Sequence, residues 1–229
     1  MQVRLAAAGA VLGLALAIGV PTAWELTRPS AAAGAPVEEA VSGSPGPVPP
    51  PAPAAPTTSP PAPDLLPEAT GRDARPTSAV AAPAPTRLVV PRLGMDAPVD
   101  QVAVRDDGQM ELPEDVRRIG WYRFGPVPGA PGSAVIAGHV DDAEQGLGAI
   151  APVRGAEVGD VIEVVDAAGS TTRWQVVSRE LIEKQALPLD ALFQRDGPPR
   201  LTLITCGGPF LPELSSYSSN VVVVAEPLG

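Results

Sequence analysis

Short apolar stretches alternate with turn residues from about residue 87 to the end of the chain. The stretches are rich in Val, Ile, Leu and Thr, which favour extended backbone, and Gly, Pro and Asp separate them. The predicted strands span residues 87–90, 99–104, 133–139, 161–165, 173–178, 201–205 and 220–225. Helical turns are predicted only at 114–118 and 190–193. The pattern therefore indicates an all-β barrel or sandwich.

The pattern differs at the start of the chain, where residues 5–24 carry no charged side chain and follow Arg4. A run of this length is close to what an α-helix needs to cross a bilayer. Small residues near 21–23 leave a cleaved signal peptide as the competing interpretation. We expect an uncleaved signal-anchor at 1–28, which places a single-pass protein in the plasma membrane with the rest of the chain outside the cell.

Residues 29–86 consist mainly of Pro, Ala, Ser and Thr and hold most of the 30 prolines. Such a segment cannot bury enough apolar surface to fold, so we predict a disordered linker. In polyproline geometry it could reach up to about 180 Å, which suggests a stalk, with a passive spacer as the alternative. Residues 87–229 remain as one globular domain, long enough to bury a single core.

Charge narrows the choice of partners. The chain has a formal net charge of −10 at pH 7, most of it in the predicted domain. Nucleic-acid recognition needs a basic footprint, so no nucleic-acid partner is expected.

The chain has one cysteine, Cys206, and one histidine, His139, and each follows a predicted strand. A lone thiol cannot form an intramolecular disulfide, and one Cys with one His supplies too few ligands for zinc. A thiol and an imidazole presented at strand ends fit a nucleophilic pair. The competing interpretation is an inert buried thiol and an unrelated surface histidine.

Several stretches resemble the sortase family, most closely the class F sortases of high-GC Gram-positive bacteria. The resemblance covers essentially all of 87–229, and a membrane segment with a variable linker fits it too. It is carried by Gly120-Trp121-Tyr122, by residues 128–140 ending in Ala137-Gly138-His139-Val140, by Leu201-Thr202-Leu203-Ile204-Thr205-Cys206-Gly207-Gly208, by Tyr217 and by residues 220–225.

The resemblance implies an eight-stranded β-barrel with one or two short helices, acting as a cysteine transpeptidase without cofactor or metal. Cys206 would be the nucleophile, and His139 would protonate the leaving amine and then activate the incoming one. The implied substrates are secreted proteins with a C-terminal sorting signal of the LPxTG type. An amine of a cell-wall precursor would resolve the thioacyl-enzyme. Thr205, Leu187 and Pro188 are expected to bind the signal.

One position departs from the family pattern. Sortases usually carry an arginine at the start of the final strand, and alignment places Asn220 there. An asparagine amide can donate a hydrogen bond to an oxyanion but brings no charge, so Asn220 is the third predicted site residue. A turn residue that begins the strand is the alternative interpretation. Arg123, Arg195 or Arg200 could supply the charge from elsewhere.

The acidic run Asp141-Asp142-Ala143-Glu144 could bind calcium, although a solvated acidic loop is the preferred interpretation. Two other enzyme classes fit less well. Papain-like proteases have Cys before His and at a helix N-terminus, and L,D-transpeptidases carry a Ser-His-Gly-Cys signature that is missing here. A non-enzymatic alternative is an exported adhesin or a catalytically weak or inactive sortase-like module that binds peptides.

Overall fold

A computed structural model describes residues 31–43 and 82–228 of the chain. The predicted signal-anchor and most of the predicted linker lie outside the described residues. Within the part that is described, no helix is long and apolar enough to span a bilayer.

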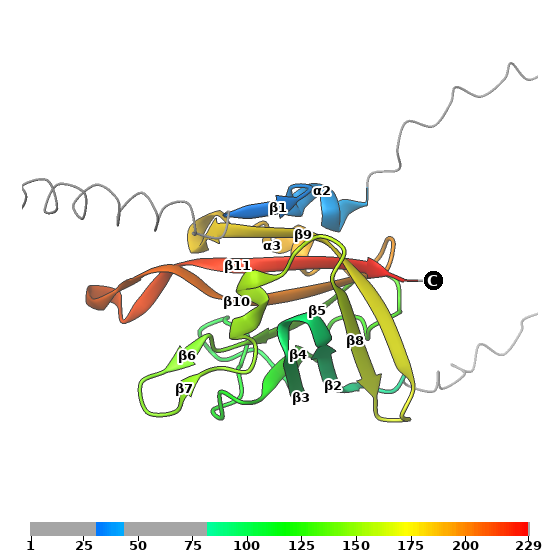
Figure 1. Cartoon of the computed structure of the whole chain (residues 1–229), viewed down its shortest axis with the longest axis horizontal. Coiled ribbons are helices and arrows are strands. Elements are labelled where there is room, and N and C mark those ends of the chain that lie inside the picture. Colours follow the sequence, from blue (N-terminus) through cyan, green and yellow to red (C-terminus); the bar gives the residue numbers. More distant parts are fainter. Residues whose placement is uncertain (1–30, 44–81, 229) are drawn as a thin grey trace, which may run out of the picture.

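The described chain forms strands, two short α-helices and four 3-10 turns (Figure 1). In chain order these elements are β1 (Ala32–Gly34), α2 (Val37–Ser42), β2 (Pro85–Val90), η1 (Pro91–Leu93), β3 (Met95–Val102), β4 (Ile119–Tyr122), β5 (Ser133–Gly138), β6 (Asp141–Asp142), β7 (Gly146–Leu147), η2 (Ala151–Gly155), β8 (Val161–Asp166), β9 (Thr171–Glu183), η3 (Lys184–Ala186), α3 (Leu189–Leu192), β10 (Arg200–Leu211), η4 (Pro212–Leu214) and β11 (Ser216–Pro227).

Eight of the strands close into a barrel. Their order is β9-β11-β10-β5-β4-β3-β2-β8, and β8 pairs back onto β9. The pairs β3–β4 and β5–β10 are parallel, and the other pairs in the ring are antiparallel. Closure leaves no unpaired edge among these eight strands. The predicted all-β barrel with short helices is therefore confirmed.

Alternating side chains fill the barrel. On β11, Val221 and Val223 point into the interior core, together with Leu201 and Leu203 of β10. Their neighbours Val222 and Val224 are also fully buried, although alternation turns them to the outside of the barrel. A continuous run of valines in one strand is typical of a strand that is covered on both faces.

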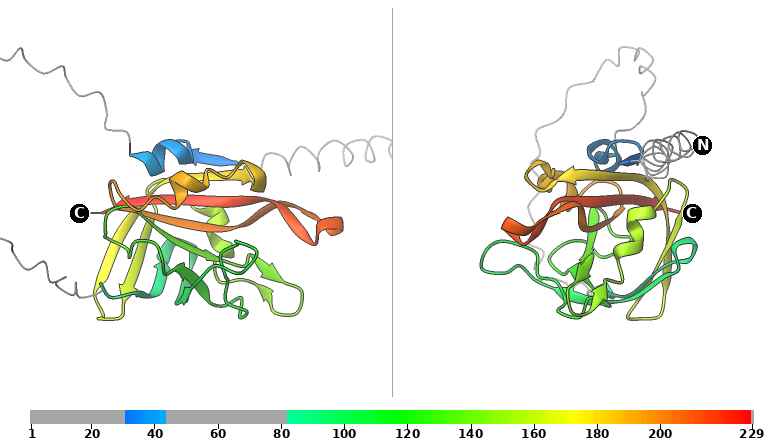
Figure 2. Two further views of the ribbon diagram at one scale, coloured as in Figure 1. Left: turned by 180° about the vertical axis from the view of Figure 1, so that it is seen from behind. Right: turned by 60° about the vertical axis from the view of Figure 1, so that its left-hand side comes forward.

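The outer cover comes from a segment that we predicted to be disordered. The N-terminal segment, residues 31–43, contributes β1, which pairs with β9, and α2, which lies on the outside of the barrel beside α3 (Figures 1 and 2). The prediction of a linker throughout 29–86 is wrong for these residues. Val37, Ala40 and Val41 follow helical spacing and are buried, so even this Pro- and Ala-rich stretch has an apolar face to pack.

Candidate active site

Cys206 lies inside β10 rather than at its end. The sequence predicted that the strand stops at Thr205, but pairing with β11 continues to Leu211. The register shifts between Gly207 and Phe210, and Gly208 adopts a positive φ of 75° there. Only glycine accommodates that conformation easily, which gives Gly208, the second of the two glycines after the cysteine, a structural reason. The thiol-bearing residue itself is partly exposed.

His139 follows β5, which runs parallel to β10. The last residue pair of these two strands is Thr205 with Gly138, so the next residue on each strand is Cys206 and His139. Neighbouring strands lie about 4.8 Å apart, which makes the thiol and imidazole residues neighbours. His139 is partly exposed, as Cys206 is.

Asn220 lies directly opposite Cys206 in the antiparallel pair β10–β11. Opposed residues in such a pair have Cβ atoms about 4.5–5.5 Å apart. The sequence predicted that Asn220 begins the final strand. This boundary is wrong, because β11 starts at Ser216. The position of Asn220 in the middle of the ladder argues against a role as a turn residue.

The three residues share one face of the sheet. Ala134 and Ile136 of β5, Leu203 of β10 and Val221 of β11 belong to the interior core. Alternation from these positions turns His139, Cys206 and Asn220 to the outside of the barrel. A thiol, an imidazole and an amide therefore converge on one outer surface.

Thr205, predicted to bind substrate, is buried and bonds to the neighbouring strand β5. It is 2% exposed, and its Oγ1 donates a hydrogen bond of 2.9 Å to the carbonyl oxygen of Gly138. The hydroxyl therefore fastens β10 to β5 just before the cysteine and the histidine. The side chain of Thr205 faces inward and is positioned to align the two strands rather than to line an outer surface.

Leu187 and Pro188 precede α3 and are partly buried. Leu187 packs against the outer apolar cluster, as do Ile204, two residues before Cys206, and Ile182, the register partner of Asn220. The outer apolar cluster consists of Val37, Ala40, Val41, Leu192, Val222 and Val224. An apolar surface thus begins immediately beside the three polar residues.

Tyr217 links the two sides of the site, a contact that the sequence did not predict. Its hydroxyl donates a hydrogen bond of 2.5 Å to Oδ2 of Asp141, two residues after His139. This hydrogen bond and burial raise the pKa of Tyr217 above its ordinary value, while the charge of the exposed Arg154 acts in the opposite sense. The contact ties the β10–β11 hairpin to the loop that carries the histidine.

The acidic loop uses its carboxylates locally. Oδ1 of Asp142 accepts hydrogen bonds of 2.9 Å from the backbone N–H groups of Glu144 and Gln145. These bonds, with a smaller contribution from His139, lower the pKa of Asp142. Across residues 31–43 and 82–228, no group of three or more potential metal ligands is present.

The arginines considered as substitutes for the usual family arginine lie away from the thiol. Arg200 begins β10 six residues before Cys206, is 8% exposed and pairs with Glu226 at 3.0 Å. Arg195 lies beside Gly132, before the start of β5. Arg123 follows β4 and stacks on Phe124, at the end of that strand remote from His139. None of the three is positioned to supply charge at Cys206.

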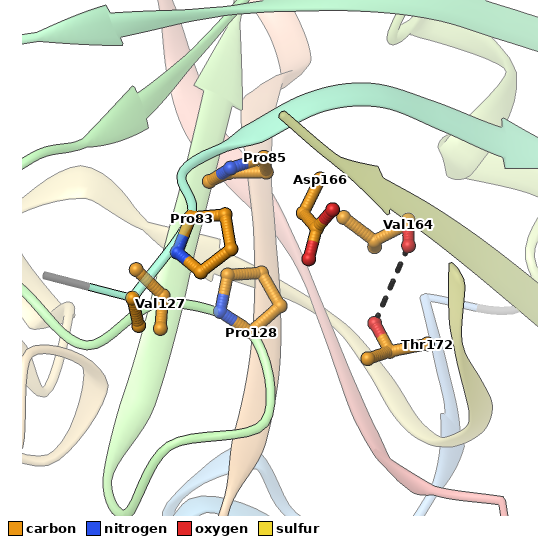
Figure 3. Close-up of a pocket in the computed structure, with 8 residues that line it drawn as sticks. Pro83, Pro85, Val127, Pro128, Val164, Asp166 and Thr172 are labelled. Carbon is orange, nitrogen blue, oxygen red and sulfur yellow. Dashed lines mark hydrogen bonds between the residues drawn. The ribbon is translucent and has the colours of Figure 1, made fainter. Parts of the chain in front are cut away.

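A small pocket of about 90 Å³ opens at the other end of the barrel (Figure 3). Prolines at the start of β2 and after β4 form much of its wall, and Asp166 is its one ionisable residue. Thr172, near the start of β9, also lines it. Since β9 reaches the Asn220 region only at Ile182, the pocket is remote from the three polar residues.

The fold is a closed β-barrel that carries its single thiol on β10 and its single imidazole directly after β5, the strand parallel to β10. Sequence comparison matches residues 88–228 to the sortase domain, and the chain belongs to the sortase family. Its fold is similar to that of sortase A from Corynebacterium diphtheriae, at 18% identity and a TM-score of 0.50, over 64% of this chain and 61% of that one.

Two further structures are similar to this chain. A lid mutant of the Corynebacterium diphtheriae sortase A gives 18% identity and a TM-score of 0.50, over 67% of this chain and 74% of that one. Sortase C-1 from Actinomyces oris gives 19% identity and a TM-score of 0.49, over 62% of this chain and 73% of that one. No curated protein matches the chain. At such identities the structural likeness concerns the fold alone, and this chain spans less than two thirds of the first structure's length.

Proposed function

We propose that this chain is a sortase-type cysteine transpeptidase, of class F, that cleaves LPxTG-like sorting signals and transfers the protein to a cell-wall amine. One observation carries the proposal: the registers of β5, β10 and β11 make His139, Cys206 and Asn220 neighbours on one outer face. The motif resemblance supports the assignment to class F.

In the proposed reaction the Cys206 thiolate attacks the carbonyl carbon of the signal's Thr. The S–C bond forms, the C–N bond to the next residue breaks, and His139 gives its proton to the departing amine. The acceptor amine then attacks the thioester and loses a proton to the neutral imidazole. The S–C bond breaks, which regenerates the thiolate and the imidazolium.

Asn220 is proposed to stabilise the tetrahedral intermediate. Its side-chain N–H can donate to the oxyanion from the position opposite Cys206. The charge that an arginine brings in the family pattern is missing at this position. The charge of the exposed Arg154 acts on Tyr217, three residues before Asn220, so Arg154 is proposed to add a weaker, longer-range contribution.

The apolar surface beside Cys206 is proposed to hold the Leu and Pro of the signal. Ile182, Ile204 and Leu187 form that surface on the strands and on the segment before α3. An apolar surface with a few polar groups at one end fits a peptide that ends in a polar cleavage site.

The proposed partners are secreted proteins with a C-terminal sorting signal and a cell-wall precursor amine. We propose that residues 1–28 anchor the chain in the plasma membrane with the barrel outside, because of their uncharged run after Arg4. Membrane fractionation of the full-length chain tests the anchor, and recovery of a soluble form starting near residue 24 would contradict it.

The reaction is tested with a fluorogenic LPxTG-type peptide and an amine acceptor, followed by mass spectrometry of both products. Cys206→Ala is expected to abolish cleavage and transfer, and His139→Ala to abolish turnover while leaving the thiol present. Asn220→Ala is expected to lower kcat by roughly 10- to 1,000-fold.

Turnover that persists in Cys206→Ala would overturn the nucleophile assignment. An unchanged kcat in Asn220→Ala would return that residue to a structural role. Peptide binding without cleavage by the wild-type chain would instead favour the inactive peptide-binding module, for which the asparagine in place of arginine is the supporting observation.

A further inference from the structure

The N-terminal segment is built into the outside of the barrel by several independent contacts. β1 pairs antiparallel with β9, with Ala32 opposite Glu180 and Gly34 opposite Ser178. The Leu181 N–H donates a further hydrogen bond of 2.9 Å to the Ala31 carbonyl oxygen. These bonds continue the barrel sheet by one strand beyond the closed ring.

Gly34 shows how closely the segment approaches β9. A Cβ atom at this position would lie 2.1 Å from the carbonyl oxygen of Val177, and its φ is 88°. Immediately after it, the Ser178 hydroxyl donates a hydrogen bond of 2.5 Å to the Ala35 carbonyl oxygen. A larger residue at position 34 would clash with backbone that cannot move aside without distorting β9.

Two charged side chains of the barrel fasten α2. The Val37 N–H, at the start of the helix, donates a hydrogen bond of 3.1 Å to Oε2 of Glu180. Near its end, Nε of the buried Arg200 donates one of 2.7 Å to the Ala40 carbonyl oxygen. Both bonds join groups far apart in the sequence, so the helix is held at both ends by the barrel.

The helix also closes an apolar cluster that reaches the proposed site. Val37 and Val41 pack with Leu192 of α3 and with Val222 and Val224 of β11, and each of these is at most 3% exposed. The same cluster continues through Leu187, Ile182 and Ile204 to the residues beside Cys206. Figure 2 shows α2 and α3 together on this side of the barrel.

Residues 187–192, which precede β10, form a segment with little stability of its own. α3 has four residues, a single turn, and such a helix is not stable without tertiary packing. Leu192 is its buried anchor, and α2 covers it from outside. The position of residues 187–192 therefore depends on the cover that the N-terminal segment provides.

We propose that the N-terminal segment is a positioning element for the apolar surface that binds the sorting signal: by packing on α3 it fixes Leu187 and its neighbours beside Cys206 and thereby sets the affinity for the signal. This inference rests on the proposed function. The segment touches neither the thiol nor the imidazole, so it acts on substrate binding and not on the chemical step.

The test compares two adjacent substitutions on α2 in the full chain. Val41→Asp places a charge in the buried cluster, whereas Ser42→Asp places the same charge at an exposed position one residue later. Val41→Asp is expected to raise KM for the peptide about tenfold while kcat stays within about twofold of wild type. Ser42→Asp is expected to leave both KM and kcat unchanged. The rate at which iodoacetamide alkylates Cys206 is expected to be the same in both variants as in wild type.

Hydrogen exchange supplies a readout that does not need turnover. Amides of residues 187–193 are expected to lose protection in Val41→Asp and to keep it in Ser42→Asp. If Val41→Asp fails to fold, Gly34→Ala, which disturbs β1 without touching the cluster, serves as the second variant.

An unchanged KM together with lost protection of the N-terminal segment would overturn the proposal, as would unchanged protection of 187–193. A wild-type chain that does not turn over peptide would instead contradict the proposed function. In that case the exchange result alone decides whether the segment positions α3.

Discussion

The barrel interior and the outer apolar cluster are two apolar regions with different construction. The interior core draws on every strand of the ring and lies within one stretch of the chain, from Leu88 to Ala225. The outer apolar cluster joins three short pieces, residues 37–41, α3 and the outward-facing valines of β11. Both regions bury their members almost completely.

This difference separates two tasks. The interior core closes the barrel and thereby fixes the registers that bring Cys206, His139 and Asn220 together. The outer apolar cluster fixes only what lies on that face, namely α2, α3 and the apolar surface beside the thiol. Damage to the first region should unfold the protein, whereas damage to the second should loosen a surface.

The largest expected effect comes from a matched pair of leucines. Leu203 in the interior and Leu192 in the outer cluster are both fully buried. Leu203→Ala is expected to lower the free energy of unfolding by about 2–5 kcal/mol, because the closed barrel cannot collapse onto the cavity. Leu192→Ala should lower the free energy of unfolding, measured by urea denaturation, by less than Leu203→Ala does, since surface helices can relax. It should raise the KM for the peptide more than Leu203→Ala does. Equal losses in unfolding would mean that the two regions are one cooperative core.

A smaller effect is expected at Asp160, which is buried directly before β8. Burial alone would raise the pKa of Asp160, but hydrogen bonds from Arg92 and the Glu157 N–H outweigh it and hold that pKa below its ordinary value. Its stabilisation is therefore complete above about pH 4, the unfolded value, and is lost as pH falls through the lower folded pKa. Asp160→Asn should lower the free energy of unfolding at pH 7 by about 1–2 kcal/mol. It should also make the loss of stability between pH 7 and acidic pH smaller than in wild type.

Asp96 provides the control for that measurement. It also pairs with an arginine, Arg87, but both side chains are about half exposed. Because water screens such a pair, Asp96→Asn should change the acid limb of thermal unfolding much less than Asp160→Asn does. An equal change would show that burial of the carboxylate is not what matters.

The smallest effect is expected from the hydroxyl of Tyr217. Tyr217→Phe removes the hydrogen bond to Asp141 and should lower kcat/KM by about 2- to 10-fold, the equivalent of one ordinary hydrogen bond. Tyr122→Phe is the control, because Tyr122 packs edge-on against Phe193 and lies at the end of β4 remote from His139. A larger loss of kcat/KM in Tyr122→Phe than in Tyr217→Phe would contradict a role of the Tyr217–Asp141 hydrogen bond in the site.

Most of the interior strands could be predicted from the sequence, because alternation and β-branched residues mark them. β4 could not, since its four residues, Ile-Gly-Trp-Tyr, are too few to show a period. Residues 114–118, predicted to hold one helical turn, form a single turn closed by a hydrogen bond of 2.9 Å from the Arg118 N–H to the Asp115 carbonyl oxygen, and no helix follows. There the Asp115 carboxylate accepts a hydrogen bond from the Arg117 N–H, a local contact that competes with helix formation.

The prediction of the outer region failed for a different reason. Val37 and Val41 lie among prolines and alanines, and their packing partners Leu192 and Val222 follow more than 150 residues later. No pattern in the neighbouring sequence predicts a contact between segments so far apart. In the site, the unusual residue types marked Cys206 and His139, but the Tyr217–Asp141 contact and the inward direction of Thr205 depend on registers that only the closed barrel sets.

If residues 1–28 anchor the chain, as proposed, the attachment of β1 to β9 limits how far the barrel can lie from that anchor. Because residues 31–43 are fixed to the barrel, the number of residues between 43 and 82 does not change the distance between such an anchor and the barrel. If residues 5–24 hold the chain in the bilayer, only the seven peptide units from Trp24 to Ala31 remain, an extended length of at most about 25 Å. The barrel would then lie close to the lipid surface. Energy transfer between labelled lipid and a labelled barrel would measure that height.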